Sequence, residues 1–196
     1  MTRRNSVFYR FELFSILLLY TTQLKAVMLS RSNIHYLLMA GLLLTAQTGL
    51  SQVESNAFGF MLRTLLDHSV PEINVRDASR DSAAILFLDA RENSEYQVSH
   101  LNHAIHVGYD YFDATQWKDI PRNRRLVVYC SVGYRSEKVT EKLKNAGFTN
   151  VSNLYGGIFE WVNQGFPVYR DGKQVKEVHA YDRVWGVWLR KGEKIY

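Results

Sequence analysis

The only cysteine of this chain, Cys130, follows an apolar run and opens a short polar segment. That segment is Cys130-Ser131-Val132-Gly133-Tyr134-Arg135-Ser136. A thiol in a tight loop is a candidate nucleophile, and a nearby arginine offers a planar fork of donors to an anion. A lone cysteine is more often a small apolar core residue without chemistry. The polar residues, glycine and arginine that follow this cysteine favour a chemical site instead.

The elements on either side must position this loop. Residues 126–129 are apolar and include two β-branched valines, which predicts a short buried strand. After the loop, apolar residues recur at helical spacing among charged ones. These apolar residues are Val139, Leu143 and Ala146. Gly147 then stands where a helix C-cap glycine belongs, so the sequence predicts a strand, a loop and a helix in that order.

This order of elements predicts an anion site around the thiol. The loop amides should point inward at the positive end of the helix dipole, where an anion is favoured. The same field favours the thiolate form of Cys130, which is the nucleophilic form. Arg135 would hold an anionic substrate or line the loop, and Ser131 and Ser136 could add hydroxyl donors. Gly133 supplies the conformational freedom that so tight a turn requires.

The chain resembles the single-domain rhodaneses, which are sulfurtransferases, over residues 56–170. The second half of the resemblance consists of Tyr129-Cys130, Gly133-x-Arg135-Ser136, Leu143, Gly147-Phe148, Val151, Leu154-x-Gly156-Gly157-Ile158, Trp161 and Gly165-Phe166-Pro167-Val168. The first half consists of Leu88-Asp89-Ala90-Arg91, Glu95-Tyr96, His100-Leu101 and Ala104-Ile105. Two positions depart from the family pattern: Ser99 replaces a usual glycine, and Asn102-His103 replaces a frequent proline-glycine pair. Several separated motifs in the right order make the resemblance highly specific.

The resemblance also separates two chemistries by loop length. Rhodaneses have six residues from cysteine through arginine, whereas the related phosphatases and arsenate reductases carry one more to fit a larger tetrahedral anion. Cys130 through Arg135 is the six-residue form. The resemblance therefore implies sulfur transfer, with phosphatase or arsenate reductase chemistry disfavoured.

The implied mechanism is covalent and has two steps. Cys130 would attack the outer sulfur of a small anionic donor such as thiosulfate, and a persulfide would remain on it. Cyanide, another thiol or a protein cysteine would then accept the sulfur, and no metal or organic cofactor is needed. Because the chain has one cysteine, it has no second thiol to resolve the persulfide, and the acceptor must come from outside. A non-catalytic sulfur-carrier or binding module is the alternative function.

Other residues with ionisable side chains are better explained as structural support. Asp89, Arg91 and Glu95 follow the apolar run at residues 85–88 and are expected to fix the loop beyond it. His100, His103 and His106 are spaced by three, which raises a metal hypothesis. No carboxylate or cysteine pattern accompanies these histidines, and His100 matches a loop-ordering position of the family. We therefore predict no metal site.

Alternation of strand-like and helical segments predicts the fold. Strands are expected at residues 73–75, 85–88, 104–107, 126–129 and 151–154, with an opening helix over 57–66. This alternation predicts an α/β fold with a mostly parallel central sheet. The resemblance implies that the fold is rhodanese-like, with helices on both faces of the sheet. Residues 109–112 are expected to pack beside the site. Residues 53–170 are expected to form the domain, and residues 171–196, too apolar for a free tail, are expected to pack on it.

The N-terminal segment has the pattern of a leader. Residues 28–52 contain one basic residue, an apolar core and then small polar residues, which predicts a secretory signal peptide. We expect translation to begin at Met28, residues 1–27 not to belong to the protein, and the product to be exported to the periplasm. An uncleaved anchor in the membrane is the alternative, although the apolar part is short for a span.

Residues 1–52 carry most of the excess positive charge of the sequence. Residues 1–52 contain five of the 24 Lys and Arg residues and one of the 19 Asp and Glu residues. The remainder holds 19 basic and 18 acidic residues, a net charge of +1. A nearly neutral domain offers no electrostatic argument for nucleic-acid binding.

Overall fold

The structure, a computed structural model, describes residues 53–196. The predicted signal peptide or anchor at residues 28–52 and the extension at residues 1–27 lie outside the described residues. Within the described part of the chain, no helix has the length and apolarity needed to cross a membrane.

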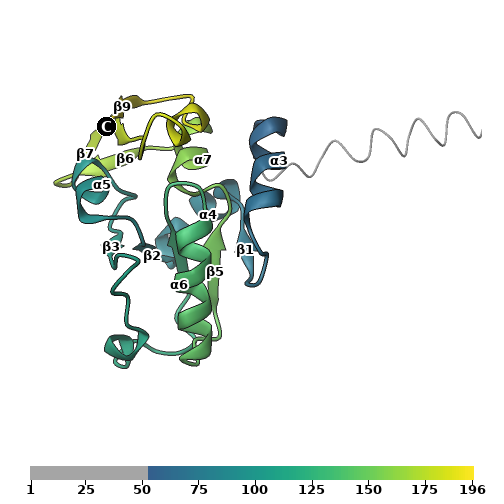
Figure 1. The fold of residues 1–196 in the computed structure, drawn as a ribbon. Helices are drawn as coiled ribbons and strands as arrows, with labels where there is room; N and C mark the ends of the chain where they lie inside the picture. Colours follow the sequence, from purple (N-terminus) through teal and green to yellow (C-terminus); the bar gives the residue numbers. More distant parts are fainter. Residues whose placement is uncertain (1–52) are drawn as a thin grey trace, which may run out of the picture. The chain divides into compact units, whose positions relative to one another are not determined.

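A parallel sheet of five short strands forms the centre of the described region. The strands are β1 (Glu72–Ile73), β2 (Leu86–Asp89), β3 (Ile105–His106), β4 (Leu126–Tyr129) and β5 (Val151–Leu154). They lie in the order β1-β5-β4-β2-β3, with every neighbouring pair parallel. Figure 1 labels these strands and the helices around them. The predicted α/β fold is therefore confirmed, and the sheet is entirely rather than mostly parallel.

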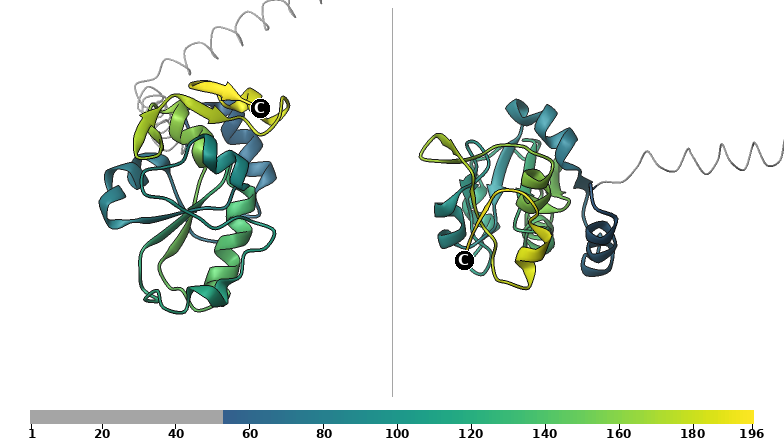
Figure 2. Two further views of the ribbon diagram at one scale, coloured as in Figure 1. Left: turned by 90° about the vertical axis from the view of Figure 1, so that its left-hand side faces the viewer. Right: turned by 90° about the horizontal axis from the view of Figure 1, so that it is seen from above.

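Side chains of successive strand residues enter two separate hydrophobic clusters, one on each face of the sheet. Phe87 and Val127 belong to the larger cluster with residues of α4 (Val75–Arg80) and α7 (Gly157–Asn163). Leu88 and Val128 belong to the other, which α6 (Tyr134–Asn145) covers. This alternation is the period of two that strand geometry imposes. Helices thus lie on both faces, as the left-hand view of Figure 2 shows.

The first strand ends earlier than predicted, because a helix begins directly after it. It was expected at residues 73–75, but β1 ends at Ile73 and α4 begins at Val75. The Asn74 side chain accepts a hydrogen bond from the Asp77 amide at 2.9 Å and so caps the helix. An asparagine N-cap supplies an acceptor for a free amide of the first turn, and here it ends the strand.

The remaining helices and strands lie outside the central sheet. They are α3 (Asn56–Leu65), α5 (Asn93–Val98), and the short 3-10 helices η2 (Ser82–Ala84), η3 (Ala114–Trp117) and η4 (Trp185–Trp188). The C-terminal strands are β6 (Val168–Arg170), β7 (Lys173–Val175), β8 (Glu177–His179) and β9 (Glu193–Ile195). β6 pairs with β7 in antiparallel fashion, and β8 pairs with β9 in parallel.

The C-terminal segment is packed on the domain through buried side chains and hydrogen bonds. Val178 and Leu189 are fully buried, and the Trp188 ring stacks on Phe58 of α3 at 5.4 Å between centroids. The Ser99 hydroxyl donates to the Glu177 carbonyl at 2.6 Å, which ties the end of α5 to β8. Residues 171–196 therefore cover the end of the domain at which β4 delivers Cys130, drawn in yellow in Figure 1.

Candidate active site

The Cys130 loop lies between the end of β4 and the beginning of α6. β4 ends at Tyr129 and α6 begins at Tyr134, so the predicted order of strand, loop and helix is confirmed. Gly133 has φ +122°, a backbone conformation that side-chain-bearing residues rarely adopt. Its amide donates to Cys130 Sγ at 3.2 Å. Cys130 is 1% exposed and lies at the positive end of a twelve-residue helix.

Two carbonyl groups of the loop are turned away from the sulfur by α7. The Ile158 amide donates to the Cys130 carbonyl at 2.9 Å, and the Phe159 amide donates to the Ser131 carbonyl at 3.1 Å. These donors are unpaired amides of the first turn of α7, which need acceptors. Because α7 takes the loop carbonyls, the negative ends of these peptide groups are directed away from the site of the thiol.

Close contact between α7 and the loop requires glycine at position 157. Gly157 has φ +57°, and a Cβ on it would collide with the carbonyl oxygen of Cys130 and lie 2.7 Å from that of Ser131. Gly147 at the end of α6 also has a positive φ, +93°, but a Cβ there meets nothing within 4 Å. Comparing substitutions at these two glycines therefore separates the cost of a strained backbone from the cost of a steric collision.

Gly157→Ala is expected to lower the free energy of unfolding by at least about 3 kcal/mol, because it combines backbone strain with overpacking. Gly147→Ala carries the strain alone and should cost about 1 kcal/mol. Urea unfolding of both variants measures the difference. Equal losses would show that α7 is not seated against the loop as described.

Arg135 is already paired in the structure. Its Nη1 and Nη2 donate to Glu95 Oε2 at 2.7 Å and Oε1 at 2.9 Å, and Nη2 also donates to Ser131 Oγ at 3.0 Å. The Ser131 hydroxyl in turn donates to Glu95 Oε1 at 2.9 Å. Of the two roles expected for Arg135, this geometry favours lining and bracing the loop over holding an anion. Bidentate pairs of this kind are geometrically specific as well as strong.

Burial and pairing act in opposite directions on Glu95. The side chain is 2% exposed, and burial acts to raise its pKa. The hydrogen bonds and the charge of Arg135 outweigh burial and hold the pKa of Glu95 below its ordinary value. Glu95 also accepts from the Glu92 amide at 3.0 Å as part of a capping box at the start of α5. The carboxylate therefore connects α5 to the Cys130 loop.

Asp89 and Arg91 hold the segment from which α5 begins. Arg91 donates to both Asp89 oxygens, the shortest bond being 2.7 Å from Nη2, and both side chains are fully buried. Arg91 Nη2 also donates to the Ser99 carbonyl at 2.6 Å. Neither side chain lines the pocket at Cys130. Their position fits the predicted supporting role, and Glu95 is the member of the group that reaches the loop.

Two of the three histidines, His100 and His106, lie beside the same Tyr96 ring. The His100 ring stacks on Tyr96 at 4.2 Å between centroids, with Nδ1 2.9 Å from the Leu101 carbonyl. His106 Nε2 lies 2.8 Å from the Arg91 carbonyl, and His103 has φ +56° in a turn. Among residues 53–196, no three His, Cys, Asp or Glu side chains gather closely enough to hold a metal ion.

A pocket of about 410 Å³ opens at Cys130. It is lined by Leu65, Glu92, Tyr109, Asp110, Cys130, Ser131, Val132, Tyr134, Arg135, Tyr181 and Trp185. The volume falls within the range of small-molecule sites in proteins. The structure thus brings five of the loop residues expected at the site to one cavity, and it places Tyr109 and Asp110 beside them, where residues 109–112 were expected.

Two residues of the loop lie elsewhere. Gly133 and Ser136 do not line the pocket. The Ser136 hydroxyl lies 2.7 Å from Asn153 Oδ1 and 3.1 Å from the Gly133 carbonyl, both acceptors, and it is fully buried. In the first turn of α6 the Ser136 hydroxyl is directed at Asn153 of the sheet, and its donation to a substrate stays a prediction.

Several residues at the site, some of them lining the pocket, could not be identified from the loop motif. Asn153 of β5 also donates to the Gly133 carbonyl at 3.0 Å and so braces the turn at the cysteine. Leu65 comes from the end of α3, and Tyr181 and Trp185 come from the C-terminal segment. The only sequence signal for the last two was the high aromatic content of a segment that we expected to pack on the domain.

Comparisons with known proteins agree with this geometry. A family model described as Rhodanese-like domain matches residues 74–164. A curated tRNA uridine(34) hydroxylase from Escherichia coli strain K12 / DH10B is 33% identical over 106 residues, which is 50% of this chain and 30% of that protein. The chain therefore spans less than a third of the length of the curated relatives it matches.

Two solved structures are similar to part of this chain. A rhodanese-related protein from Thermoplasma volcanium is 29% identical, with a TM-score of 0.47, and the match covers 50% of this chain and 97% of that one. A thiosulfate sulfurtransferase from Pseudomonas aeruginosa is 27% identical, with a TM-score of 0.47, over 62% of this chain and 24% of that one. The family-model match and the resemblance of its motifs identify one part of this protein: the chain contains a rhodanese-like domain at residues 74–164.

Proposed function

We propose that this protein is a sulfurtransferase that moves a sulfane sulfur from thiosulfate or a similar donor to a nucleophilic acceptor through a persulfide on Cys130. The observation that carries the proposal is the position of the cysteine. Its sulfur lies in the wall of a pocket, 3.2 Å from the Gly133 amide and at the N-terminal end of α6. These are the groups that stabilise a negatively charged sulfur.

In the first half-reaction, the Cys130 thiolate attacks the outer sulfur of thiosulfate. A bond forms between Sγ and that sulfur, the bond to the sulfonate group breaks, and sulfite leaves with the electron pair. The product is a persulfide whose outer sulfur extends into the pocket. The loop amides and the α6 dipole stabilise its charge, and no outside oxidant or reductant takes part.

In the second half-reaction, an acceptor attacks the outer sulfur of the persulfide. The new bond joins that sulfur to the acceptor, and the electron pair of the broken sulfur–sulfur bond returns to Cys130 Sγ. The acceptor must come from outside because Cys130 is the only cysteine. The pocket of about 410 Å³ leaves room for it.

The six-residue span from Cys130 to Arg135 supports sulfur transfer over phosphoryl or arsenate chemistry. Arg135 directs donors from Nη1 and Nη2 to the buried Glu95 carboxylate. This ion pair leaves little free positive charge for a phosphate, an arsenate or a thiosulfate dianion alike.

A non-catalytic sulfur carrier is the second candidate, and the same ion pair favours it. Because Glu95 already neutralises Arg135, a free anionic donor has little charge to bind in the pocket. A partner protein that delivers sulfur directly to Cys130 would not need that charge. Stable persulfide loading with very slow turnover of small donors would identify this function.

The test is thiocyanate formation from thiosulfate and cyanide by the full chain. A sulfurtransferase is expected to form thiocyanate at a rate proportional to enzyme concentration, with sulfite released in the first step. Failure to form either product would contradict the enzymatic proposal. Persulfide loading without thiocyanate formation would instead favour the carrier.

A further inference from the structure

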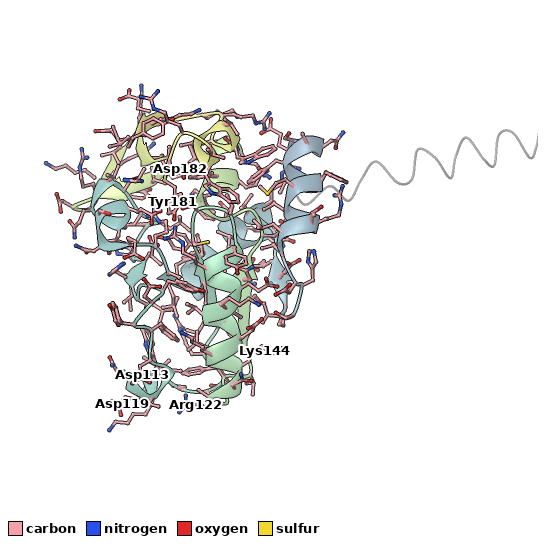
Figure 3. The ribbon with its side chains drawn as sticks, in the orientation of Figure 1. Asp113, Asp119, Arg122, Lys144, Tyr181 and Asp182 are labelled. Atoms are coloured by element: carbon pink, nitrogen blue, oxygen red, sulfur yellow. The ribbon has the colours of Figure 1, made fainter. Side chains whose placement is uncertain are left out.

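Part of the pocket wall at Cys130 comes from outside the matched rhodanese-like segment at residues 74–164. Leu65 of α3 and Tyr181 and Trp185 of the C-terminal segment line the same cavity as the cysteine. Figure 3 labels Tyr181 and Asp182, which lie near the N-terminal end of α6. The chemical character of these residues bears on which molecules the pocket can bind.

Tyr181 is fixed in an unusual backbone conformation beside the loop. It has φ +66°, a region in which bulky residues are rare and strained. Its amide donates to His179 Nδ1 at 3.0 Å, and the Asp182 side chain accepts from the Trp185 amide at 2.8 Å. This turn places the Tyr181 ring 5.1 Å from the Arg135 guanidinium carbon. The strained residue is thus one that contributes an aromatic ring to the pocket wall.

The charge of the pocket is acidic rather than basic. Arg135 is the only cation among the lining residues, and the buried Glu95 pairs with it at 2.7 Å. Glu92 and Asp110, both exposed, are the two lining carboxylates. Glu92 Oε1 reaches Arg135 only at 4.0 Å, and Asp110 has no ion pair within residues 53–196. Lys142 lies 5.9 Å from the centre of the Tyr109 ring and does not line the cavity.

Four of the eight remaining lining residues are aromatic. Tyr109, Tyr134, Tyr181 and Trp185 contribute side chains to the pocket. Aromatic faces attract cations through their quadrupole, and exposed carboxylates attract them through charge. The same groups repel an anionic molecule. An aromatic wall with two carboxylates therefore suits an organic cation better than an organic anion.

We propose that the sulfur acceptor of this protein is a small organic thiol that carries a positive charge, that is, an aminothiol. The inference rests on the proposed function, because it concerns the second half-reaction at the same cysteine. The acceptor thiolate attacks the outer sulfur of the Cys130 persulfide and becomes a persulfide itself. The electron pair of the broken bond returns to Cys130, while the ammonium group lies against the carboxylates and rings.

The test uses three thiols of equal chain length and different charge: cysteamine, 2-mercaptoethanol and thioglycolate. The full chain is loaded with sulfur from thiosulfate or polysulfide, freed of donor and mixed with each thiol. Loss of the persulfide is followed by intact mass. The second-order rate constants are compared as the ratio of cysteamine to thioglycolate, so that the intrinsic reactivity of each thiol cancels between protein variants.

The variants neutralise the two carboxylates singly and together, as Glu92→Gln, Asp110→Asn and the double variant. Each neutralised carboxylate is expected to lower the ratio about threefold, the size of an exposed charge interaction, and the double variant about tenfold. The second-order rate constant of 2-mercaptoethanol should lie between those of the two charged thiols. Asp119→Asn is the matched control, because Asp119 lies at the opposite end of the domain from Tyr181 in Figure 3, and its ratio should equal that of the wild type.

A ratio that stays the same in both single variants and the double variant, with the persulfide loaded, would overturn the inference and leave the sulfurtransferase proposal standing. An equal fall in Asp119→Asn would also overturn it, because net charge rather than the pocket would then set the preference. Failure of the wild type to load sulfur from either donor would overturn the proposed function and this inference with it.

Discussion

Cys130→Ser is expected to reduce sulfur transfer to the rate of the uncatalysed reaction. Serine keeps the size of the side chain and an acceptor for the Gly133 amide, which lies 3.2 Å from the sulfur. It cannot form a persulfide, because the covalent intermediate needs a sulfur nucleophile. The loss should therefore appear in turnover and not in folding. Thiocyanate formation and urea unfolding of the wild type and the variant measure the two quantities.

The control for this variant is Ser131→Ala, which changes the neighbouring residue and leaves the thiol in place. It removes the hydroxyl that donates to Glu95 at 2.9 Å and accepts from Arg135 at 3.0 Å, and it should weaken turnover only in part. Substantial turnover by Cys130→Ser would exclude covalent catalysis by this cysteine. A large fall in its unfolding free energy would mean that the thiol is a core residue and the loop a structural turn.

Glu95→Ala is expected to lower the free energy of unfolding by about 3 kcal/mol or more and to lower turnover with it. The substitution leaves Arg135, whose side chain is 14% exposed, without its buried partner. Removing one member of a buried ion pair typically costs about 3–5 kcal/mol, because the other charge stays desolvated. It also removes an acceptor from Ser131 and from the Glu92 amide. Urea unfolding measures the loss.

An exposed ion pair provides the comparison. Glu54 and Arg190 form a bond of 3.2 Å with both side chains more than 40% exposed. Glu54→Ala should cost at most about 1 kcal/mol, because water screens the charges and solvates the arginine that remains. If Glu95→Ala costs no more than Glu54→Ala, the carboxylate does not brace the Cys130 loop.

The pH dependence of the same ion pair has a definite sign. The pKa of Glu95 in the folded protein lies below its ordinary value of 4.5, mainly because Arg135 outweighs burial. Between the two pKa values the unfolded chain binds the proton more readily, so stability rises with pH in that window. The contribution of Glu95 is complete above pH 4.5 and is lost as the pH falls through the folded value. The gap between wild type and Glu95→Ala should therefore narrow on acidification, which urea unfolding over a pH series measures.

Several strands and the Cys130 loop could be predicted from local sequence. Residues 126–129 and 151–154 are strands with the predicted bounds. Residues 126–129 are a continuous apolar run, which marks a strand buried on both faces. The loop at Cys130 was predictable because a strand, a glycine-containing turn and a helix follow one another without interruption. Strand order follows less directly: β1 occupies an edge beside β5, and no local pattern specifies that neighbour.

Which residues form the pocket depends on contacts between segments that are far apart in the sequence. Glu95 and Arg135 are separated by 40 positions, and their pairing follows from the direction in which α5 approaches the loop. Tyr181 and Trp185 reach the cavity because β8 packs against α5 and leads the chain back over α6. The sequence did not indicate that the helical phase of α6 turns the Ser136 hydroxyl toward Asn153. Such features depend on tertiary packing that residue spacing does not encode.

The most direct test of the account is the intact mass of the full chain after incubation with thiosulfate or polysulfide, followed by removal of the donor. The account predicts that the wild type gains the mass of one sulfur atom, that a thiol reductant removes it, and that Cys130→Ser gains nothing. A wild type that gains no mass from either donor, or a Cys130→Ser variant that gains as much as the wild type, would contradict the assignment of Cys130 as the carrier of the sulfur.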